Sequence, residues 1–153
     1  ASLLGLCDIQ HEEATAAMRL EALAATRKGR ILEGWSIEDS VISIDGILAS
    51  ILSNPDKAQA AADFHRTLAK ALSQAALDAA KEIGYEGPVA LTGGCAVNRL
   101  LVASVSEDLK SGGFKVLIPK DVPAGDGGLA LGELWLAALA YKAGKTHYAW
   151  REN

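Results

Sequence analysis

Apolar side chains recur along the chain with two different periods, and together these periods predict a mixed α/β fold. Steps of three and four residues, typical of amphipathic helices, occupy residues 11–28, 56–83, 96–110 and 129–141. Short β-branched runs, typical of buried strands, occupy Val89–Thr92 and Phe114–Ile118. Because strand, helix and strand follow one another at short intervals, we expect a right-handed βαβ unit with parallel strands at the core and helices packed on it.

Residues 30–55 give a less regular pattern. Ile31–Leu32 and Val41–Ile44 are apolar pieces on either side of a glycine and a polar run, and they suggest two short strands. The apolar positions after Asp45 predict a short helix that ends before Pro55, since proline disfavours helical backbone in the residue that precedes it. Residues 144–153 are expected to form a polar tail.

Composition limits the class of protein. A chain of 153 residues, half of them hydrophobic, is long enough for one domain with a core. A net charge of −4 without a basic stripe argues against a nucleic-acid partner, and no apolar run is long enough for a membrane span. Cys7 and Cys95 are too few for a disulfide framework or a closed zinc site, which favours the cytoplasm. The missing initiator methionine suggests a piece of a larger protein, in which case a site shared with the remainder would be half present.

The first candidate site is the two-glycine turn between the Val89–Thr92 strand and the following helix. Gly93 and Gly94 lack a Cβ, so a ligand can approach their backbone closely. The helix start that follows offers free N–H groups to an anion, with Asn98 expected in its first turn. A plain strand-to-helix turn without a ligand remains the alternative, because a full phosphate-loop signature is absent.

The second candidate site is the glycine-rich passage from residue 124 to residue 132. Gly127 and Gly128 follow Asp126 directly, and a helix is predicted from Leu129. Asp126 either caps that helix or holds a cation where the backbone opens. Since ligands gather at the carboxyl edge of a parallel sheet, both turns are expected at one edge, with an anion at Gly93 and a metal at Asp126.

Other polar residues fit structural roles better than chemical ones. His65 lies among apolar positions of the long helix and is interpreted as a hydrogen-bonded core histidine. Cys95 is interpreted as a packed small residue, because no base is spaced to activate its thiol. No Ser/His/Asp order and no paired carboxylates are found.

Several segments resemble, in order, the C-terminal part of the HypF family, the carbamoyltransferases of nickel–iron hydrogenase maturation. The segments are Leu91–Leu101, Gly113–Val116, Val122–Gly132 and, earlier in the chain, Ala16–Ala24 and Phe64–Ala69. The resemblance implies a sugar kinase/actin-like (ribonuclease H-like) fold, with residues 1–153 as a single partial domain, the C-terminal lobe of the carbamoyltransferase domain.

The resemblance also implies a reaction. In HypF an upstream domain makes carbamoyl-adenylate from carbamoyl phosphate and ATP, and the carbamoyl group passes to the C-terminal cysteine of the acceptor protein HypE. By motif matching, Gly93 and Gly94 would lie against the nucleotide together with the 127–128 glycines, and Asn98 would hydrogen-bond it. Asp126 would be a ligand of a divalent metal, zinc or iron. The family's HxxxH metal ligands are absent, so the metal is expected to be shared with the missing lobe, and the chain alone is expected not to turn over.

Two other functions fit the same residues. A lobe similar to the threonylcarbamoyl enzyme TsaD would act on tRNA, although the acidic balance counts against that substrate. A non-catalytic nucleotide-binding or protein-docking module is the other alternative. An isolated lobe would also expose apolar surface, through which a homodimer could form.

Overall fold

The computed structural model describes residues 1–9 and 11–144. Its elements are α1 (Thr15–Ala24), β1 (Ser36–Glu38), β2 (Val41–Ser43), α2 (Asp45–Ser53), α3 (Lys57–Glu82), β3 (Val89–Ala90), the 3₁₀ turn η1 (Gly94–Val97), α4 (Arg99–Ser111), β4 (Val116–Leu117), the 3₁₀ turn η2 (Asp126–Gly128) and α5 (Leu129–Lys142). The expected polar tail lies, except for Gly144, outside the described residues.

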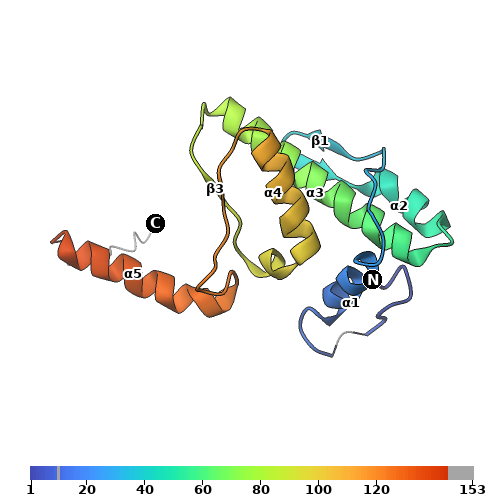
Figure 1. Ribbon diagram of the computed structural model, residues 1–153, viewed down its shortest axis with the longest axis horizontal. Helices are drawn as coiled ribbons and strands as arrows, with labels where there is room; N and C mark the ends of the chain where they lie inside the picture. The colour runs from blue at the N-terminus through green and yellow to red at the C-terminus, as the bar shows by residue number, and fades with distance from the viewer. Residues whose placement is uncertain (10, 145–153) are drawn as a thin grey trace.

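Helix α3 is the central element, and α1, α2, α4 and the β1–β2 hairpin all contact it (Figure 1). Its first turn is capped by Asp56, whose carboxylate accepts hydrogen bonds from the backbone N–H groups of Ala58 and Gln59, each at 3.0 Å. Many of its buried positions are alanines. Because alanine side chains are short, neighbouring helices can approach the α3 backbone closely.

The apolar core is divided into two clusters, one at the first turns of α3 and one that begins at its middle. One cluster joins Ile47 and Ile51 of α2 with Ala24 of α1 and the alanines at 60–62. The other joins Val105 and Leu109 of α4 with Ala69, and strands β3 and β4 pack against it through partly buried side chains. The second cluster therefore attaches the parallel strands to the helical part of the molecule.

The parallel strand pair predicted from the sequence is confirmed. Val89 pairs with Val116 and Ala90 pairs with Leu117, while α4 connects the two strands. The strands are shorter than expected, although a hydrogen bond of 3.0 Å from Leu91 N to Leu117 O continues the ladder. Both strands therefore end close together, which brings the loops that follow them to one edge.

Part of the strand prediction for residues 30–44 is wrong. Ile31–Leu32 is not a strand, because Leu32 N donates to the hydroxyl of Thr67 on α3, at 2.9 Å, instead of to a neighbouring strand. The antiparallel hairpin is instead made by β1 and β2, and Asp39 and Ser40 between them adopt φ values of 49° and 64°. Neither residue is a glycine, so this turn lacks the residue type that most often marks a tight hairpin.

Helix α5 has the predicted bounds to within one residue, but its expected apolar face is largely exposed. None of its residues is buried, and Leu134 and Trp135 are 67% and 65% exposed. In Figure 1 the helix extends away from the body formed by α1 to α4. Such an apolar helix is usually covered in a folded protein. Among the described residues, every helix is too short or too polar to span a lipid bilayer.

Candidate functional site

The two glycine-bearing loops meet at the carboxyl ends of β3 and β4, as the sequence predicted. Gly93 N donates a hydrogen bond of 2.7 Å to Ala124 O, which joins the loop after β3 to the loop after β4. A Cβ built on Gly125 would lie only 3.7 Å from the Cα of Gly94. The backbones of the two loops are therefore in direct contact, with no side chain between them.

The glycines of this region differ in backbone conformation and in the space around them. Gly93 has φ 93° and ψ 172°, a conformation that is essentially restricted to glycine. Gly128 packs against the preceding loop, since a Cβ there would overlap the carbonyl oxygen of Pro123, and a Cβ on Gly127 would contact the Pro123 ring. A Cβ on Gly94 would meet nothing within 4 Å, as on Gly93, but Gly94 has no positive φ that would exclude a side chain. Gly94 therefore borders open space.

A cavity of about 460 Å³ lies beside the joined loops, within the size range of small-molecule sites, roughly 300–1,000 Å³. Gly93, Asp126 and Gly128 all line it, and Leu129 and Leu136 of α5 contribute to its apolar wall. The Asp126 side chain is exposed and does not cap a helix, since neither η2 nor α5 has a side-chain cap. The alternative that Asp126 caps the following helix is therefore wrong.

Asn98 lies elsewhere, and its expected place in the first helical turn is wrong. The chain first forms η1, and Asn98 is the N-cap of α4, with its Oδ1 accepting a hydrogen bond of 2.9 Å from Leu101 N. Asn98 does not line the 460 Å³ cavity. The sequence did not reveal this because a 3₁₀ turn and an α-helix begin with similar residue types.

Two residues from other helices hold the start of α4. Glu21 of α1 accepts a hydrogen bond of 2.7 Å from Arg99 N, and His65 of α3 lies with its Nε2 3.1 Å from the Asn98 amide nitrogen. His65 is buried and its Nδ1 lies 2.8 Å from Ala61 O, which confirms its interpretation as a hydrogen-bonded core histidine. The Glu21 contact was not predicted, because 78 residues separate its partners.

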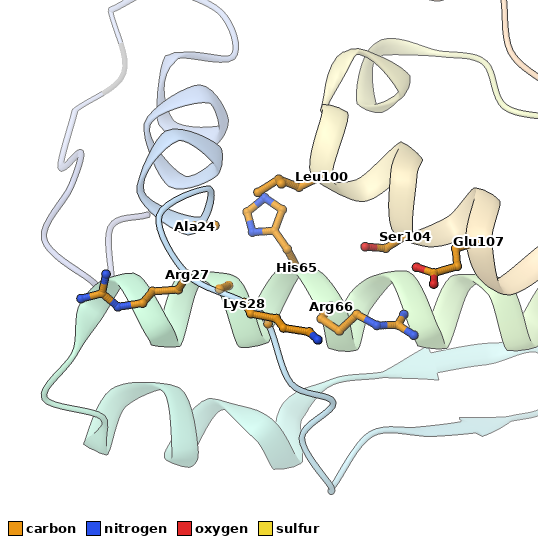
Figure 2. A pocket seen from close by; sticks show the side chains of 10 residues that line it. Ala24, Arg27, Lys28, His65, Arg66, Leu100, Ser104 and Glu107 are labelled. Carbon is orange, nitrogen blue, oxygen red and sulfur yellow. The ribbon is translucent and has the colours of Figure 1, made fainter.

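A second, smaller hollow of about 220 Å³ lies between α1, α3 and α4, with His65 in its wall (Figure 2). In Figure 2 its lining residues Lys28 and Arg66 lie below the His65 ring, and Ser104 and Glu107 come from α4. Arg66 makes a two-pronged ion pair with Asp108, at 2.7 and 2.8 Å, which raises the pKa of the guanidinium further above its usual value. That pair links α3 to α4 beside the hollow.

The loop between α1 and β1 is attached to α3 through Asp63. Its buried carboxylate accepts hydrogen bonds from Arg30 N, Arg30 Nη2 and Gln59 Nε2, at 2.8, 2.7 and 2.7 Å. Burial alone would raise the pKa of Asp63, but these hydrogen bonds outweigh it and hold the pKa below its usual value. The same loop contains Gly29, which packs so closely on α3 that a Cβ would overlap Ala62 O. Gly29 therefore serves close packing. The helix predicted over residues 11–28 is shorter than expected, since α1 stops at Ala24.

Two further findings bear on chemistry. Among residues 1–9 and 11–144, no three His, Cys, Asp or Glu side chains are grouped so that they could hold a metal ion. Asp126 can therefore supply one ligand, but the described part of the chain does not fit a complete metal site. The prediction that Cys95 is packed is wrong, since its free thiol is exposed next to the Gly93–Gly94 turn.

Comparison with known proteins gives a consistent result along the chain. Residues 1–133 match the family described as carbamoyltransferase, Kae1-like domain, second subdomain. The carbamoyltransferase HypF homolog of Cupriavidus necator is 40% identical over 162 residues, covering 96% of this chain and 41% of that protein. Carbamoyltransferase HypF of Rhizobium leguminosarum bv. viciae is 37% identical over 136 residues, covering 87% of this chain and 18% of that protein.

Two crystal structures share the fold. HypF of T. kodakarensis superposes with a TM-score of 0.79 at 28% identity, covering 94% of this chain and 19% of that one. Full-length HypF in its phosphate- and nucleotide-bound form superposes with a TM-score of 0.77 at 30% identity, covering 96% of this chain and 20% of that one. The chain thus spans less than half the length of these relatives, and it belongs to the HypF carbamoyltransferase family, within the second subdomain of the Kae1-like domain.

Proposed function

We propose that the chain forms the nucleotide-facing side of the transfer site of a HypF-type carbamoyltransferase. In this proposal the carbamoyl group of carbamoyl-adenylate, made from ATP and carbamoyl phosphate, passes to the C-terminal cysteine of a HypE-type acceptor protein. Support comes from the family and from one similar crystal structure, that of full-length HypF in a phosphate- and nucleotide-bound form. The activity belongs to the whole protein, meaning this chain together with any sequence beyond its 153 residues.

The observation that carries the proposal is the contact between the two glycine loops. The hydrogen bond between Gly93 N and Ala124 O holds them together beside a cavity that Asp126 also lines. Gly94 borders open space, so a nucleotide could lie directly against its backbone. Backbone N–H groups in such a turn favour the negative charge of a phosphate. Asn98 is proposed as a further hydrogen-bonding partner of the nucleotide.

The chemistry proposed for this chain is positioning and charge stabilisation. The acceptor's thiolate would attack the carbamoyl carbon, the bond from that carbon to the phosphate oxygen would break, and AMP would leave with its negative charge. The acceptor supplies the nucleophile, so no nucleophilic side chain is needed here. We assign Asp126 as one ligand of a divalent metal, zinc or iron, whose other ligands come from outside the described residues.

The test is carbamoylation of the acceptor by the whole protein. Purified protein, ATP, carbamoyl phosphate and HypE-type acceptor are mixed, and mass spectrometry measures the mass of the acceptor's C-terminal peptide. The wild type is expected to add one carbamoyl group. Asp126→Asn is expected to lose the transfer, whereas Asp121→Asn, a matched exposed aspartate in the same loop that does not line the cavity, is expected to retain it.

Two results would contradict the proposal. An acceptor whose mass never changes with the wild-type protein would refute the reaction itself. Equal transfer by the Asp126 and Asp121 variants would refute the role given to the loop after β4. Loss of metal from the Asp126 variant, measured by elemental analysis, would separate a ligand role from a purely structural one.

A further inference from the structure

His65 connects the longest helix to the residue that follows the glycine turn. Its ring lies on α3 with only 6% of the residue exposed. Nδ1 is 2.8 Å from Ala61 O, and Nε2 is 3.1 Å from Asn98 Nδ2. In Figure 2 the imidazole rises from α3 to the side of Leu100, in the first turn of α4. The ring thus bridges two elements that are distant in sequence.

The hydrogen-bond partners determine which nitrogen of His65 carries the proton. A carbonyl oxygen only accepts, so Nδ1 must donate to Ala61 O. Asn98 Oδ1 already accepts from Leu101 N, so the group that faces His65 is the amide NH₂, which only donates. Nε2 is therefore the acceptor, and the arrangement requires a neutral imidazole in the Nδ1–H form.

This arrangement fixes the Asn98 amide at both ends while leaving part of it free. The oxygen is held by Leu101 N and the nitrogen by His65, so the plane of the amide is determined. An amide has a second hydrogen and a second lone pair, and these remain for a ligand. Glu21 also binds the N–H of Arg99, the next residue. The carboxyl end of η1, which begins at Gly94, is therefore held from α3 and from α1.

We propose that His65 is a positioning residue for nucleotide binding: it orients the Asn98 amide and thereby holds the end of the glycine turn. The inference rests on the nucleotide role proposed above for Asn98. His65 does not contact the ligand in this proposal, because it is buried and both ring nitrogens are already used. Because His65 already orders the Asn98 side chain, less conformational entropy is lost when the nucleotide binds.

Two substitutions at this position separate positioning from packing. His65→Asn places an amide group near the Nδ1 position and keeps the bond to Ala61 O, but it has nothing at the Nε2 position. His65→Gln reaches the Nε2 position and can accept from Asn98, but it loses the bond to Ala61 O. Each variant removes one buried hydrogen bond, so a purely structural role predicts similar effects of both. Ser73→Ala is the matched control, since it removes the buried bond of 2.8 Å from Ser73 Oγ to Ala69 O on the same helix.

The experiment measures the Kd of a non-hydrolysable ATP analogue with Mg²⁺ by calorimetry, in the whole protein, together with the melting temperature. His65→Asn is expected to weaken binding about three- to tenfold, the equivalent of one hydrogen bond. For His65→Gln and Ser73→Ala we expect a Kd within about twofold of the wild-type value, a change smaller than the loss of one hydrogen bond would cause. Melting temperatures report whether each variant is folded at the temperature of the titration.

The outcomes distinguish this inference from the function on which it rests. Equal affinities of the Asn and Gln variants at position 65, whether both weak or both normal, overturn the positioning role. If Asn98→Ala weakens binding while His65→Asn does not, only the role of His65 is refuted. If Asn98→Ala binds as the wild type does, the proposed contact of Asn98 with the nucleotide fails and the role of His65 fails with it.

Discussion

Substitution of the neighbouring glycines 93 and 94 by alanine should separate folding from ligand binding. Gly94 has no positive φ, and a Cβ there would meet nothing within 4 Å. Alanine is therefore compatible with the fold, and it restricts the unfolded chain, so Gly94→Ala should change the free energy of unfolding by between zero and about +1 kcal/mol. Yet the added methyl group would point into the space assigned to the nucleotide.

Gly93 should behave in the opposite way. Its φ of 93° with ψ of 172° costs a residue with a Cβ about 1–3 kcal/mol. Relief of that strain would rotate the turn and weaken the 2.7 Å hydrogen bond from Gly93 N to Ala124 O, which is worth roughly 1 kcal/mol. Gly93→Ala should therefore destabilise the protein by about 2–4 kcal/mol, the approximate sum of these two costs.

The assay compares the Kd of an ATP analogue with the melting temperature for each variant of the whole protein. We expect Gly94→Ala to weaken binding at least about tenfold, or about 1.4 kcal/mol, with an unchanged or slightly higher melting temperature. Gly93→Ala should lower the melting temperature, because its main effect is to destabilise the fold. Wild-type affinity of a folded Gly94→Ala protein would refute the reasoning, because it would mean that no ligand lies against this turn.

Three further predictions concern the remaining contacts. Asp63→Asn should cost roughly 2–3 kcal/mol near neutral pH. Arg30 helps to hold the pKa of the buried Asp63 below its usual value, so the stabilisation is present above about pH 4 and is lost as acid protonates the carboxylate. The free energy of unfolding of the variant, measured with denaturant, should therefore depend less on pH below about pH 4 than that of the wild type. Gly29→Ala should destabilise the chain by about 1–3 kcal/mol, because its Cβ would overlap Ala62 O; an unchanged melting temperature would contradict the close packing. The isolated chain should self-associate through α5, and Leu134→Lys should make it monomeric in analytical ultracentrifugation; a wild-type chain that sediments as a monomer would be the contrary result.

Much of the local structure could be predicted from the sequence. The period of the apolar residues placed helices near α3, α4 and α5, and the β-branched runs placed β3 and β4. The parallel pairing followed from the helix between them. The two glycine loops could be assigned to one edge of the sheet because the carboxyl ends of parallel strands lie together. These features depend on neighbours in sequence or on general rules of chain connection.

Only the tertiary structure decided which distant residues meet. His65 and Asn98 are 33 residues apart and Glu21 and Arg99 are 78 apart, and nothing in the local pattern of either pair indicates its partner. Likewise, Leu32 bonds to Thr67 of α3 instead of forming a strand, and Gly29 packs closely on the same helix. The physical reason is that periodicity fixes which face of an element is apolar, whereas the packing of whole elements determines which polar groups are brought within hydrogen-bonding distance.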